Sequence, residues 1–367
     1  MKDTKKIYKF IISGGGTGGH IFPAISIAHE IKRKWPDAKI LFIGAEGRME
    51  TVKVPQAGYE IKTIPIAGLQ RKWSLKNLLL PFKVIKSLLK TRKILKAFQP
   101  DAVIGTGGYV SLPVLWMAQQ MKIPTFIQEQ NSYPGITNKL LEKKAVKIFT
   151  AYPEAQKYFP DEKVVMSGNP VRPFHITSDK ERKNLFEKAN WGENKPVVLV
   201  LGGSLGSAAI NRAIEKMIIT HPDLPFNLYW QTGKNYFEKY KHHAREGVYI
   251  VPFIEKMDLA YGVSDLIISR AGAGTLSELA VVAKPAILIP SPNVAEDHQT
   301  KNAQSFTKHK AAVLLPETRL ENLYEKIDEM ISNKDMLESM RENLKKIAKP
   351  NAVQTIVEEI ARNLKDT

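Results

Sequence analysis

The chain has 367 residues, no cysteine and a formal net charge of +17, because 54 Lys and Arg outnumber 37 Asp and Glu. Its length favours two domains, and the lack of cysteine excludes disulfides, thiolate zinc sites and cysteine nucleophiles. It has no apolar run of about 18 residues and no apolar secretion-signal core, so we expect neither a membrane span nor a signal peptide. The basic excess favours a polyanionic partner: an anionic membrane, a phosphorylated substrate or nucleic acid.

The first half of the chain alternates strand-like runs with helical patterns, which predicts a parallel, doubly wound sheet of the α/β class. Ligands of such sheets bind at the carboxyl ends of the strands. Strands are expected at Tyr8–Ser13, Lys39–Ile43, Glu60–Ile64, Asp101–Gly105, Pro124–Gln128, Lys147–Thr150 and Lys163–Met166.

A glycine-rich loop, Gly14–Gly19, follows the first expected strand and precedes a helical pattern. This order is typical of phosphate-binding loops, in which backbone N–H groups and a helix N-terminus approach an anion. The loop also matches the dinucleotide fingerprint, but Glu46 comes too late after the second strand to hold a ribose. His20 follows the loop directly, either as a polar residue at a helix start or as a titratable group where anionic chemistry takes place.

The segment 61–100 holds ten Lys or Arg and no acidic residue. One interpretation is a helix that packs Leu78, Phe82, Ile85 and Leu89 inward and keeps its lysines outward. The other is an interfacial surface, in which apolar side chains dip between lipid headgroups while basic groups meet anionic phosphates. Nucleic acid is disfavoured, because the sequence contains no recognised nucleic-acid-binding module.

Two polar motifs follow later strands of the first half. Gly105–Pro113 repeats the strand–glycine–helix order, which indicates either a second anion at the same sheet edge or glycines that permit a tight turn. Glu129, Gln130 and Asn131 end another strand, where polar groups suit sugar hydroxyls or proton transfer, or form a bare turn.

The same plan restarts after a linker at Ser167–Pro173, where glycine and proline interrupt the periodic pattern. We therefore predict an N-terminal domain of residues 1–168 and a C-terminal domain of residues 169–349, with a tail helix at about 350–367 that packs back on the first. The second half contains expected strands at Pro196–Leu201, Phe226–Gln231, Val248–Val251, Leu266–Ser269 and Ala286–Pro290, a third glycine loop at Gly202–Ser207, a helix start within Arg270–Glu278 and a polar loop at Pro290–Gln299.

Seven of these motifs stand in the order expected of one known family: Gly14–His20, Gly105–Pro113, Glu129–Asn131, Gly168–Arg172, Gly202–Gly206, Arg270–Glu278 and Asp297–Gln299. Together they resemble the MurG family of bacterial peptidoglycan glycosyltransferases over nearly the whole chain. The polar loop departs from the family pattern before its last three residues, so no contact is assigned to residues 294–296. The resemblance implies the GT-B fold, in which two Rossmann-like doubly wound domains face a cleft.

The resemblance also implies the reaction. N-acetylglucosamine would move from UDP-N-acetylglucosamine (UDP-GlcNAc) to the C4 hydroxyl of MurNAc in undecaprenyl-pyrophosphoryl-MurNAc-pentapeptide, with inversion at the anomeric carbon. The enzyme would be a peripheral protein on the cytoplasmic face of the inner membrane and act in cell-wall biogenesis, cell shape and division. Its partners would be the two substrates, an anionic membrane surface and other cell-wall synthesis proteins, but no nucleic acid.

By resemblance, the second domain holds most of the donor. Glu278 would take the ribose hydroxyls and the backbone near Ile254 the uracil. Arg172, Ser204 and the helix start at Ala273, Gly274, Thr275, Leu276 and Ser277 would neutralise the pyrophosphate, Asn131 and Gln299 would contact the sugar, and Thr17, Gly18, Gly19 and His20 would face the donor from the first domain.

The first domain would hold the acceptor and contact the membrane. Gly107, Gly108 and Tyr109 are the expected residues near the acceptor pyrophosphate. The expected membrane patch consists of Arg71, Lys72, Trp73, Leu75, Leu79, Phe82 and Trp116.

An inverting transfer requires a base for the acceptor hydroxyl and stabilisation of the leaving diphosphate. His20 is the expected base because an imidazole titrates near neutral pH, and Glu129 is the alternative. No paired-aspartate motif occurs at an expected cleft edge, so no metal or other cofactor is expected to be essential, and a divalent cation is expected at most to stimulate.

Three alternative functions are considered. Another sugar enzyme of the same fold, such as a UDP-GlcNAc 2-epimerase or a diacylglycerol glucosyltransferase, would share the donor site but not the acceptor. An NAD-dependent enzyme is disfavoured by the position of Glu46. A basic adaptor without catalysis would leave the polar groups at the strand ends unexplained.

Overall fold

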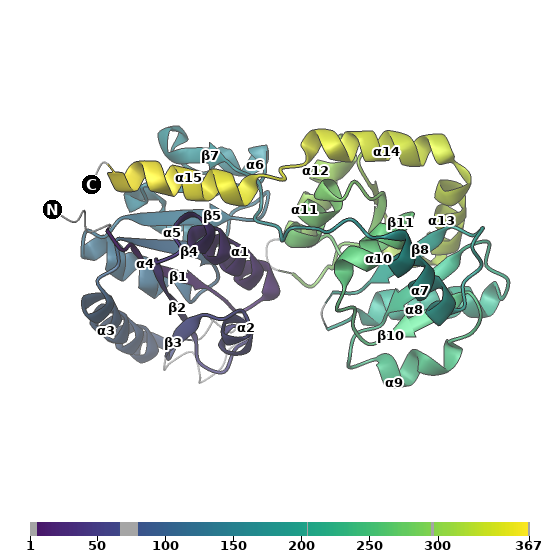
Figure 1. Cartoon of the computed structure of the whole chain (residues 1–367), viewed down its shortest axis with the longest axis horizontal. Helices are drawn as coiled ribbons and strands as arrows, with labels where there is room; N and C mark the ends of the chain where they lie inside the picture. The colour runs from purple at the N-terminus through teal and green to yellow at the C-terminus, as the bar shows by residue number, and fades with distance from the viewer. Residues whose placement is uncertain (1–5, 67–79, 204, 295–296, 366–367) are drawn as a thin grey trace. The chain divides into compact units, whose positions relative to one another are not determined.

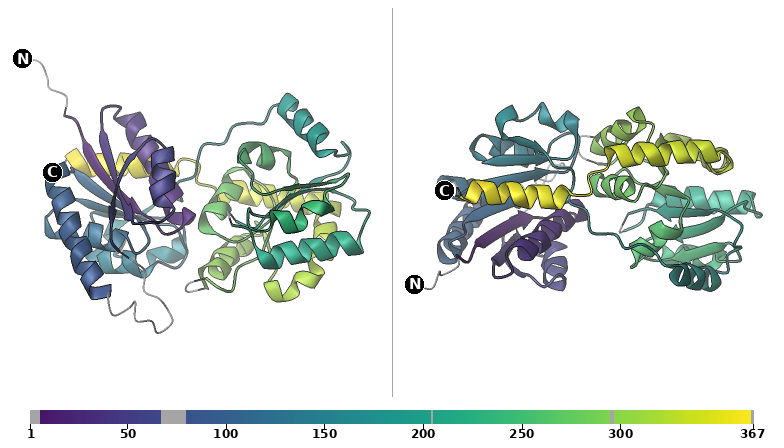
Figure 2. Two further views of the ribbon diagram at one scale, coloured as in Figure 1. Left: turned by 90° about the horizontal axis from the view of Figure 1, so that it is seen from below. Right: turned by 45° about the horizontal axis from the view of Figure 1, so that its top comes forward.

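The computed structural model describes residues 6–66, 80–203, 205–294 and 297–365. The chain divides into two compact units, unit 1 (Met1–Val171 with Lys349–Thr367) and unit 2 (Arg172–Ala348). Each unit contains one parallel sheet with helices on its faces (Figures 1 and 2). The prediction of two doubly wound α/β halves is therefore confirmed.

Unit 1 has a seven-stranded sheet in the order β3-β2-β1-β4-β5-β6-β7. The strand order reverses between β1 and β4, which is where ligands of such sheets bind. The elements of unit 1 are β1 (Lys9–Gly14), α1 (Gly18–Lys34), β2 (Lys39–Ala45), α2 (Glu50–Gln56), β3 (Glu60–Ile64), α3 (Leu80–Phe98), β4 (Ala102–Gly107), α4 (Ser111–Gln120), β5 (Thr125–Glu129), α5 (Ile136–Leu141), β6 (Lys147–Thr150), α6 (Pro153–Gln156), β7 (Val164–Met166) and α15 (Ala352–Lys365).

The sheet of unit 1 is buried on both faces, which explains why its first strand is a continuous apolar run. Phe10 and Ile12 pack into the core that α1 and α15 cover, whereas Ile11 points to the opposite core beneath α3 and α4. The tail helix α15 lies beside α1, although more than 300 residues separate them in the chain (Figure 1).

Unit 2 has a six-stranded sheet in the order β10-β9-β8-β11-β12-β13, and its order reverses between β8 and β11. Val198 and Val200 of β8 face a core covered by α8, α13 and α14, while α10 packs on β8 and contacts α7. The elements of unit 2 are α7 (Asp179–Ala189), β8 (Val197–Leu201), α8 (Ala208–Thr220), β9 (Asn227–Gln231), α9 (Phe237–Tyr240), β10 (Val248–Val251), α10 (Met257–Val263), β11 (Leu266–Ser269), α11 (Ala273–Val281), β12 (Ala286–Leu288), α12 (His298–Lys308), β13 (Val313–Leu314), α13 (Leu323–Ser332) and α14 (Lys334–Ile347).

All twelve strands expected from the sequence are present, and their ends agree with the prediction to within two residues. The thirteenth strand, β13, was not predicted, because two residues are too short to show a periodic pattern.

The interpretation in which the helix of segment 61–100 packs four apolar residues inward is wrong for three of them, and the fourth, Leu78, lies outside the described part of the chain. Phe82, Ile85 and Leu89 are 72%, 56% and 63% exposed, and the inner face of the helix carries Ile94 and Leu95 instead. Helical periodicity identifies apolar stripes but does not tell which of two stripes faces the sheet. Helix α3 therefore presents apolar side chains to solvent between its lysines.

Candidate active site

Two glycine loops meet at the point where the strand order of unit 1 reverses. Gly14–Gly19 runs from the end of β1 to the start of α1, and Gly107–Tyr109 begins at the last residue of the neighbouring strand β4. The Thr106 hydroxyl of β4 donates a hydrogen bond to the carbonyl of His20 at 2.8 Å. The structure thus brings together the His20 loop and the glycines expected near the acceptor pyrophosphate.

His20 is half-buried and its ring is held by the loop that precedes it. Nδ1 lies 3.1 Å from the Gly15 carbonyl oxygen and 3.3 Å from the Thr17 hydroxyl oxygen. A carbonyl oxygen only accepts, so Nδ1 donates in the first contact and carries the proton of the neutral ring. The neutral ring then presents Nε2 as a hydrogen-bond acceptor, which is the form that a general base requires.

The second glycine loop packs closely against the first. A Cβ at Gly107 would lie 2.9 Å from His20 Cδ2 and 3.1 Å from its Nε2, and a Cβ at Gly108 would overlap the Gly15 carbonyl oxygen. Both glycines also have positive φ, of 96° and 81°. Close packing and positive φ therefore each favour glycine at these two positions, whatever ligand the loop binds.

This packing predicts a large cost for Gly108→Ala. Gly47 offers a matched control, because its φ is also positive but a Cβ there would meet no atom within 4 Å. We expect Gly47→Ala to lower the unfolding free energy by about 1 kcal/mol, and Gly108→Ala by about 2–4 kcal/mol because overlap with Gly15 adds to the backbone strain. Calorimetric unfolding of both variants measures the difference, and equal losses would contradict the packing argument.

Tyr109 lies over the first loop, where a Cβ at Gly16 would be 3.4 Å from its ring. Burial raises the pKa of the Tyr109 phenol, and the positive charge of Arg48 opposes that rise. Tyr109 therefore remains a neutral phenol at physiological pH and contributes packing to this edge of the sheet.

Glu50 is a buried carboxylate that sequence reasoning missed. It begins α2, is fully buried, and accepts hydrogen bonds from the backbone N–H groups of Gly16 at 3.1 Å and Ala45 at 3.0 Å. The contact with Gly16 spans 34 residues of sequence, so no local spacing indicates it. An internal carboxylate thus occupies one amide of the loop that was expected to bind an anion.

Glu129 is buried at the end of β5 and accepts hydrogen bonds from the loop and helix that follow it. Its oxygens accept from the Asn131 amide nitrogen at 2.9 Å, the Gly135 nitrogen at 3.0 Å and the Asn138 side chain at 2.8 Å. Burial raises the pKa of Glu129, and these donors oppose the rise. This geometry supports a role for Glu129 in holding Asn131 in place.

Arg270 organises the corresponding sheet edge of unit 2, although the sequence did not single it out. It follows β11, donates to the Ser207 hydroxyl at 2.6 Å, and donates to the carbonyls of Ile289 and Pro290 at 3.1 and 3.2 Å. It also forms an ion pair with Glu317. This one guanidinium therefore joins the end of the third glycine loop to the loop after β12.

Glu278 lies in α11 and belongs to a ring of four side chains in which each contacts the next: Glu278, Tyr261, Phe174 and Arg172. The Tyr261 hydroxyl donates to Glu278 Oε2 at 2.9 Å, and Arg172 Nε lies 3.5 Å from Glu278 Oε1. The Arg172 guanidinium sits 5.4 Å from the centre of the Phe174 ring, which meets the Tyr261 ring edge-on at 5.7 Å. Burial raises the pKa of Glu278, and Arg172 and then Tyr261 oppose the rise.

The start of α11 holds the other residues expected at the donor pyrophosphate. Ala273 begins the helix, and the Ser277 hydroxyl donates to its carbonyl at 3.0 Å. The Leu276 side chain is fully buried in the core, so only its backbone is available to a ligand.

Gln231 links two parts of the expected donor site and was also missed. Its side chain accepts from the Ile254 amide at 2.9 Å and donates to the Gly203 carbonyl at 3.2 Å. Gln299 likewise accepts from the Ser291 amide at 2.8 Å. Internal hydrogen bonds thus hold both Ile254 and Gln299.

Six expected residues lie outside the described part of the chain: Arg71, Lys72, Trp73, Leu75, Leu79 and Ser204. Of the expected membrane patch, Phe82 and Trp116 are described, and Trp116 is 42% exposed on α4. Helices α3 and α4 pack against each other on the same face of the sheet.

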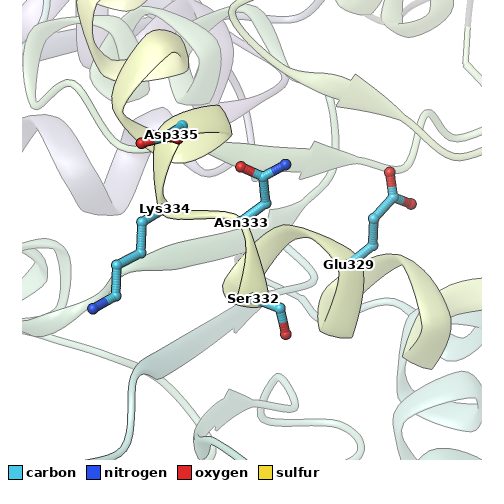
Figure 3. Close-up of a pocket in the computed structure, with 5 residues that line it drawn as sticks. All are labelled: Glu329, Ser332, Asn333, Lys334 and Asp335. Atoms are coloured by element: carbon cyan, nitrogen blue, oxygen red, sulfur yellow. The ribbon is translucent and has the colours of Figure 1, made fainter.

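Within the described ranges, no three His, Asp or Glu side chains form a group that could hold a metal ion. A polar hollow lies at the turn between α13 and α14 in unit 2 (Figure 3). Its lining residues are Glu329, Ser332, Asn333, Lys334 and Asp335, none of which was expected at the site.

Comparisons with known proteins match this chain to glycosyltransferases over nearly its whole length. Residues 10–150 match the model described as the glycosyltransferase family 28 N-terminal domain, and residues 197–356 match the C-terminal domain of the same family. The UDP-N-acetylglucosamine--N-acetylmuramyl-(pentapeptide) pyrophosphoryl-undecaprenol N-acetylglucosamine transferase of Flavobacterium psychrophilum is 51% identical over 97% of both chains, and the protein of that name from Christiangramia forsetii is 50% identical over 98% of both. The crystal structure of MurG from Acinetobacter baumannii aligns with a TM-score of 0.77 at 27% identity, covering 97% of this chain and 99% of that one.

Proposed function

The chain belongs to glycosyltransferase family 28, and we propose that it transfers N-acetylglucosamine from UDP-GlcNAc to the C4 hydroxyl of MurNAc in undecaprenyl-pyrophosphoryl-MurNAc-pentapeptide. The observation that carries this function is the 51% identity, over 97% of both chains, to a transferase named for that reaction. The GT-B architecture, with polar groups at the switch points of two parallel sheets, suits a nucleotide-sugar transferase.

In the proposed reaction, the acceptor oxygen attacks the anomeric carbon of the sugar while its bond to the diphosphate breaks. The proton of the acceptor hydroxyl moves to Nε2 of His20, and UDP leaves with the electron pair of the broken bond. The Nδ1 contact with Gly15 supports this role, because it leaves Nε2 as the acceptor of the neutral ring.

Unit 2 is the proposed donor-binding half. Glu278 would accept the ribose hydroxyls and Ile254 would meet the uracil. The third glycine loop, Arg172 and the start of α11 would stabilise the charge that develops on the diphosphate. Arg270 supports this assignment indirectly, since it holds Ser207 at the end of that glycine loop.

Helix α3 supports a peripheral position at the inner face of the membrane. Its exposed Phe82, Ile85 and Leu89 alternate with lysines, and such a face suits an anionic bilayer surface. No helix in the described ranges is long and apolar enough to cross a bilayer.

Vesicle binding tests the α3 surface. We expect the triple variant Phe82→Ser, Ile85→Ser, Leu89→Ser to bind phosphatidylglycerol vesicles at least about tenfold more weakly, because it removes apolar area that enters the interface. A matched variant with Leu205, Ile176 and Ile219 changed to Ser removes apolar groups of unit 2 that are at least 62% exposed, and it is expected to bind normally. Equal losses in cosedimentation would contradict the assignment to α3.

A transfer assay tests the function itself. Radiolabelled UDP-GlcNAc is incubated with a short-chain polyprenyl-pyrophosphoryl-MurNAc-pentapeptide, and a parallel reaction omits this acceptor. The expected result is acceptor-dependent label in the lipid product. UDP release without labelled lipid would instead indicate another acceptor or epimerisation, and no UDP release from folded protein would favour a non-catalytic adaptor.

A further inference from the structure

Glu50 is a buried carboxylate for which the described fold provides only backbone donors. Oε1 accepts from the Ala45 N–H and Oε2 from the Gly16 N–H, and the side chain is 0% exposed. Both oxygens accept hydrogen bonds, as the ionised form requires. Burying a carboxylate is costly unless hydrogen bonds and an opposite charge compensate it, so the position of Glu50 beside the His20 loop requires an explanation.

Two glycines make room for this carboxylate. A Cβ at Gly15 would overlap the Glu50 carboxyl group, and a Cβ at Gly44 would lie 2.6 Å from Glu50 Cγ. The φ angle of Gly15 is not positive, so the backbone conformation does not require a glycine there. The absence of a side chain instead lets the Glu50 carboxyl group approach. The carboxylate is thus pressed directly against the peptide that joins Gly15 to Gly16.

That peptide group is also the one that holds His20. Its N–H belongs to Gly16 and donates to Glu50, while its C=O belongs to Gly15 and accepts from His20 Nδ1 at 3.1 Å. A hydrogen bond from the N–H to an anion increases the electron density on the carbonyl oxygen of the same amide. The carbonyl then becomes a better acceptor for the imidazole proton.

We propose that Glu50 is a positioning residue that acts on His20 through the Gly15–Gly16 peptide group. It fixes the loop so that the carbonyl holds the proton on Nδ1, and its charge stabilises the imidazolium that forms when Nε2 takes a proton. In a histidine–carboxylate pair, the carboxylate contacts the imidazole directly, fixes its tautomer and stabilises the imidazolium. Here Glu50 has the same two effects through one peptide group. The kinetic part of this inference rests on the proposed function of His20 as the base.

The other charged groups around the loop have contacts of their own. Arg48 precedes α2 and acts on the Tyr109 phenol, on which Glu50 acts with the opposite sign. Glu129, beyond β4, is bound to its own loop. Glu358 of α15 lies near the other end of α1, where it acts on Arg33. All of these groups remain in a Glu50 variant, so a change in the titration of His20 reports the loss of Glu50.

The first test observes the imidazole directly and needs no activity. In the ¹⁵N spectrum of the histidine-labelled full chain, the His20 signals are assigned by their absence in His20→Gln. We expect wild-type His20 to be protonated at Nδ1 when neutral, and Glu50→Gln to mix the two tautomers and titrate at lower pH, because the variant loses a negative charge that favours the imidazolium. Identical tautomers and titration in both proteins would overturn the proposal.

The second test is a double-mutant cycle in the transfer assay. We expect Glu50→Gln to lower kcat about tenfold, part of the 10²–10⁴-fold that a general base contributes, and to shift the acid limb of the pH–rate profile to lower pH. In a His20→Ala background the same change is expected to have no further effect on kcat. If the double variant instead loses kcat by the product of the two single-variant factors, Glu50 acts independently of His20 and the positioning role is wrong.

Three controls separate this role from a loss of folding or of the proposed function. Glu30→Gln removes another buried carboxylate of unit 1, which pairs with Arg33 rather than the loop, and is expected to keep the wild-type pH profile. Glu50→Asp keeps the charge and is expected to restore part of the titration shift. If His20→Ala retains full turnover, the base role fails, while the ¹⁵N titration still decides whether Glu50 acts on His20.

Discussion

Replacing His20 by alanine is expected to lower kcat by about 10²–10⁴-fold, the range that a positioned general base contributes. The physical reason is that the acceptor hydroxyl must lose its proton as the new bond forms, and no other described side chain at this sheet edge offers an imidazole fixed by its neighbours. The KM for UDP-GlcNAc should change much less, since unit 2 is the proposed site of most donor contacts. Steady-state kinetics with both substrates varied measures the split.

The control for this prediction is His29→Ala on the same helix. His29 is exposed and its Nδ1 contacts the Tyr59 hydroxyl at 2.9 Å, so the variant removes an imidazole of α1 without touching the glycine loops. We expect it to keep wild-type kcat. A folded His20→Ala protein with near-normal turnover would remove His20 from the role of base and make Glu129 the next candidate.

Replacing Glu278 by glutamine is expected to weaken UDP-GlcNAc binding by about 10–100-fold. Hydrogen bonds to a charged acceptor contribute about 1.5–3 kcal/mol, and glutamine offers one acceptor oxygen and no charge to a ribose diol. The variant also leaves Arg172 without its carboxylate partner. Calorimetric titration with UDP-GlcNAc, without acceptor, measures the loss, and Glu238→Gln, which changes an exposed glutamate of the same unit, is the neutral control.

Tyr261→Phe extends this prediction to pH. In the proposed site both oxygens of the ionised Glu278 accept from the ribose diol, and protonation would turn one of them into a donor. UDP affinity should therefore fall as the pH drops through the pKa of Glu278, which burial raises. The Tyr261 hydroxyl opposes that rise, and its removal raises the pKa further. The fall in affinity should therefore begin at higher pH in Tyr261→Phe than in wild type, and coincident pH profiles would contradict the arrangement.

The outcome for helix α3 illustrates one limit of pattern reading. The spacing of Phe82, Ile85 and Leu89 fits an apolar stripe, and the stripe exists, but it faces solvent. Its partner stripe with Ile94 and Leu95 faces the sheet. Periodicity of 3.6 residues is a property of the helix alone, whereas the side that becomes buried depends on the strands beneath it.

The glycine loops illustrate another limit. Their positions were predictable, because a loop after a parallel strand needs residues that tolerate tight turns and positive φ. Their packing was not: Gly108 faces the Gly15 carbonyl and Gly107 faces the His20 ring across two strands. Anion binding and close packing predict the same glycine pattern, so the sequence alone could not distinguish them. The contacts show that close packing requires glycine at Gly107 and Gly108.

The sequence by itself determined the alternation of strands and helices, the restart of the plan near Ser167–Pro173, and the helix starts that carry His20 and Glu278. These are local properties, set by side-chain period and by glycine and proline. Only the tertiary structure decided which side chains hold those groups: Glu50 for the His20 loop, Arg270 for Ser207, and Tyr261 for Glu278. Such partners lie 17 to 63 residues apart, and the order of the strands in each sheet, rather than any local pattern, brings them within hydrogen-bond distance.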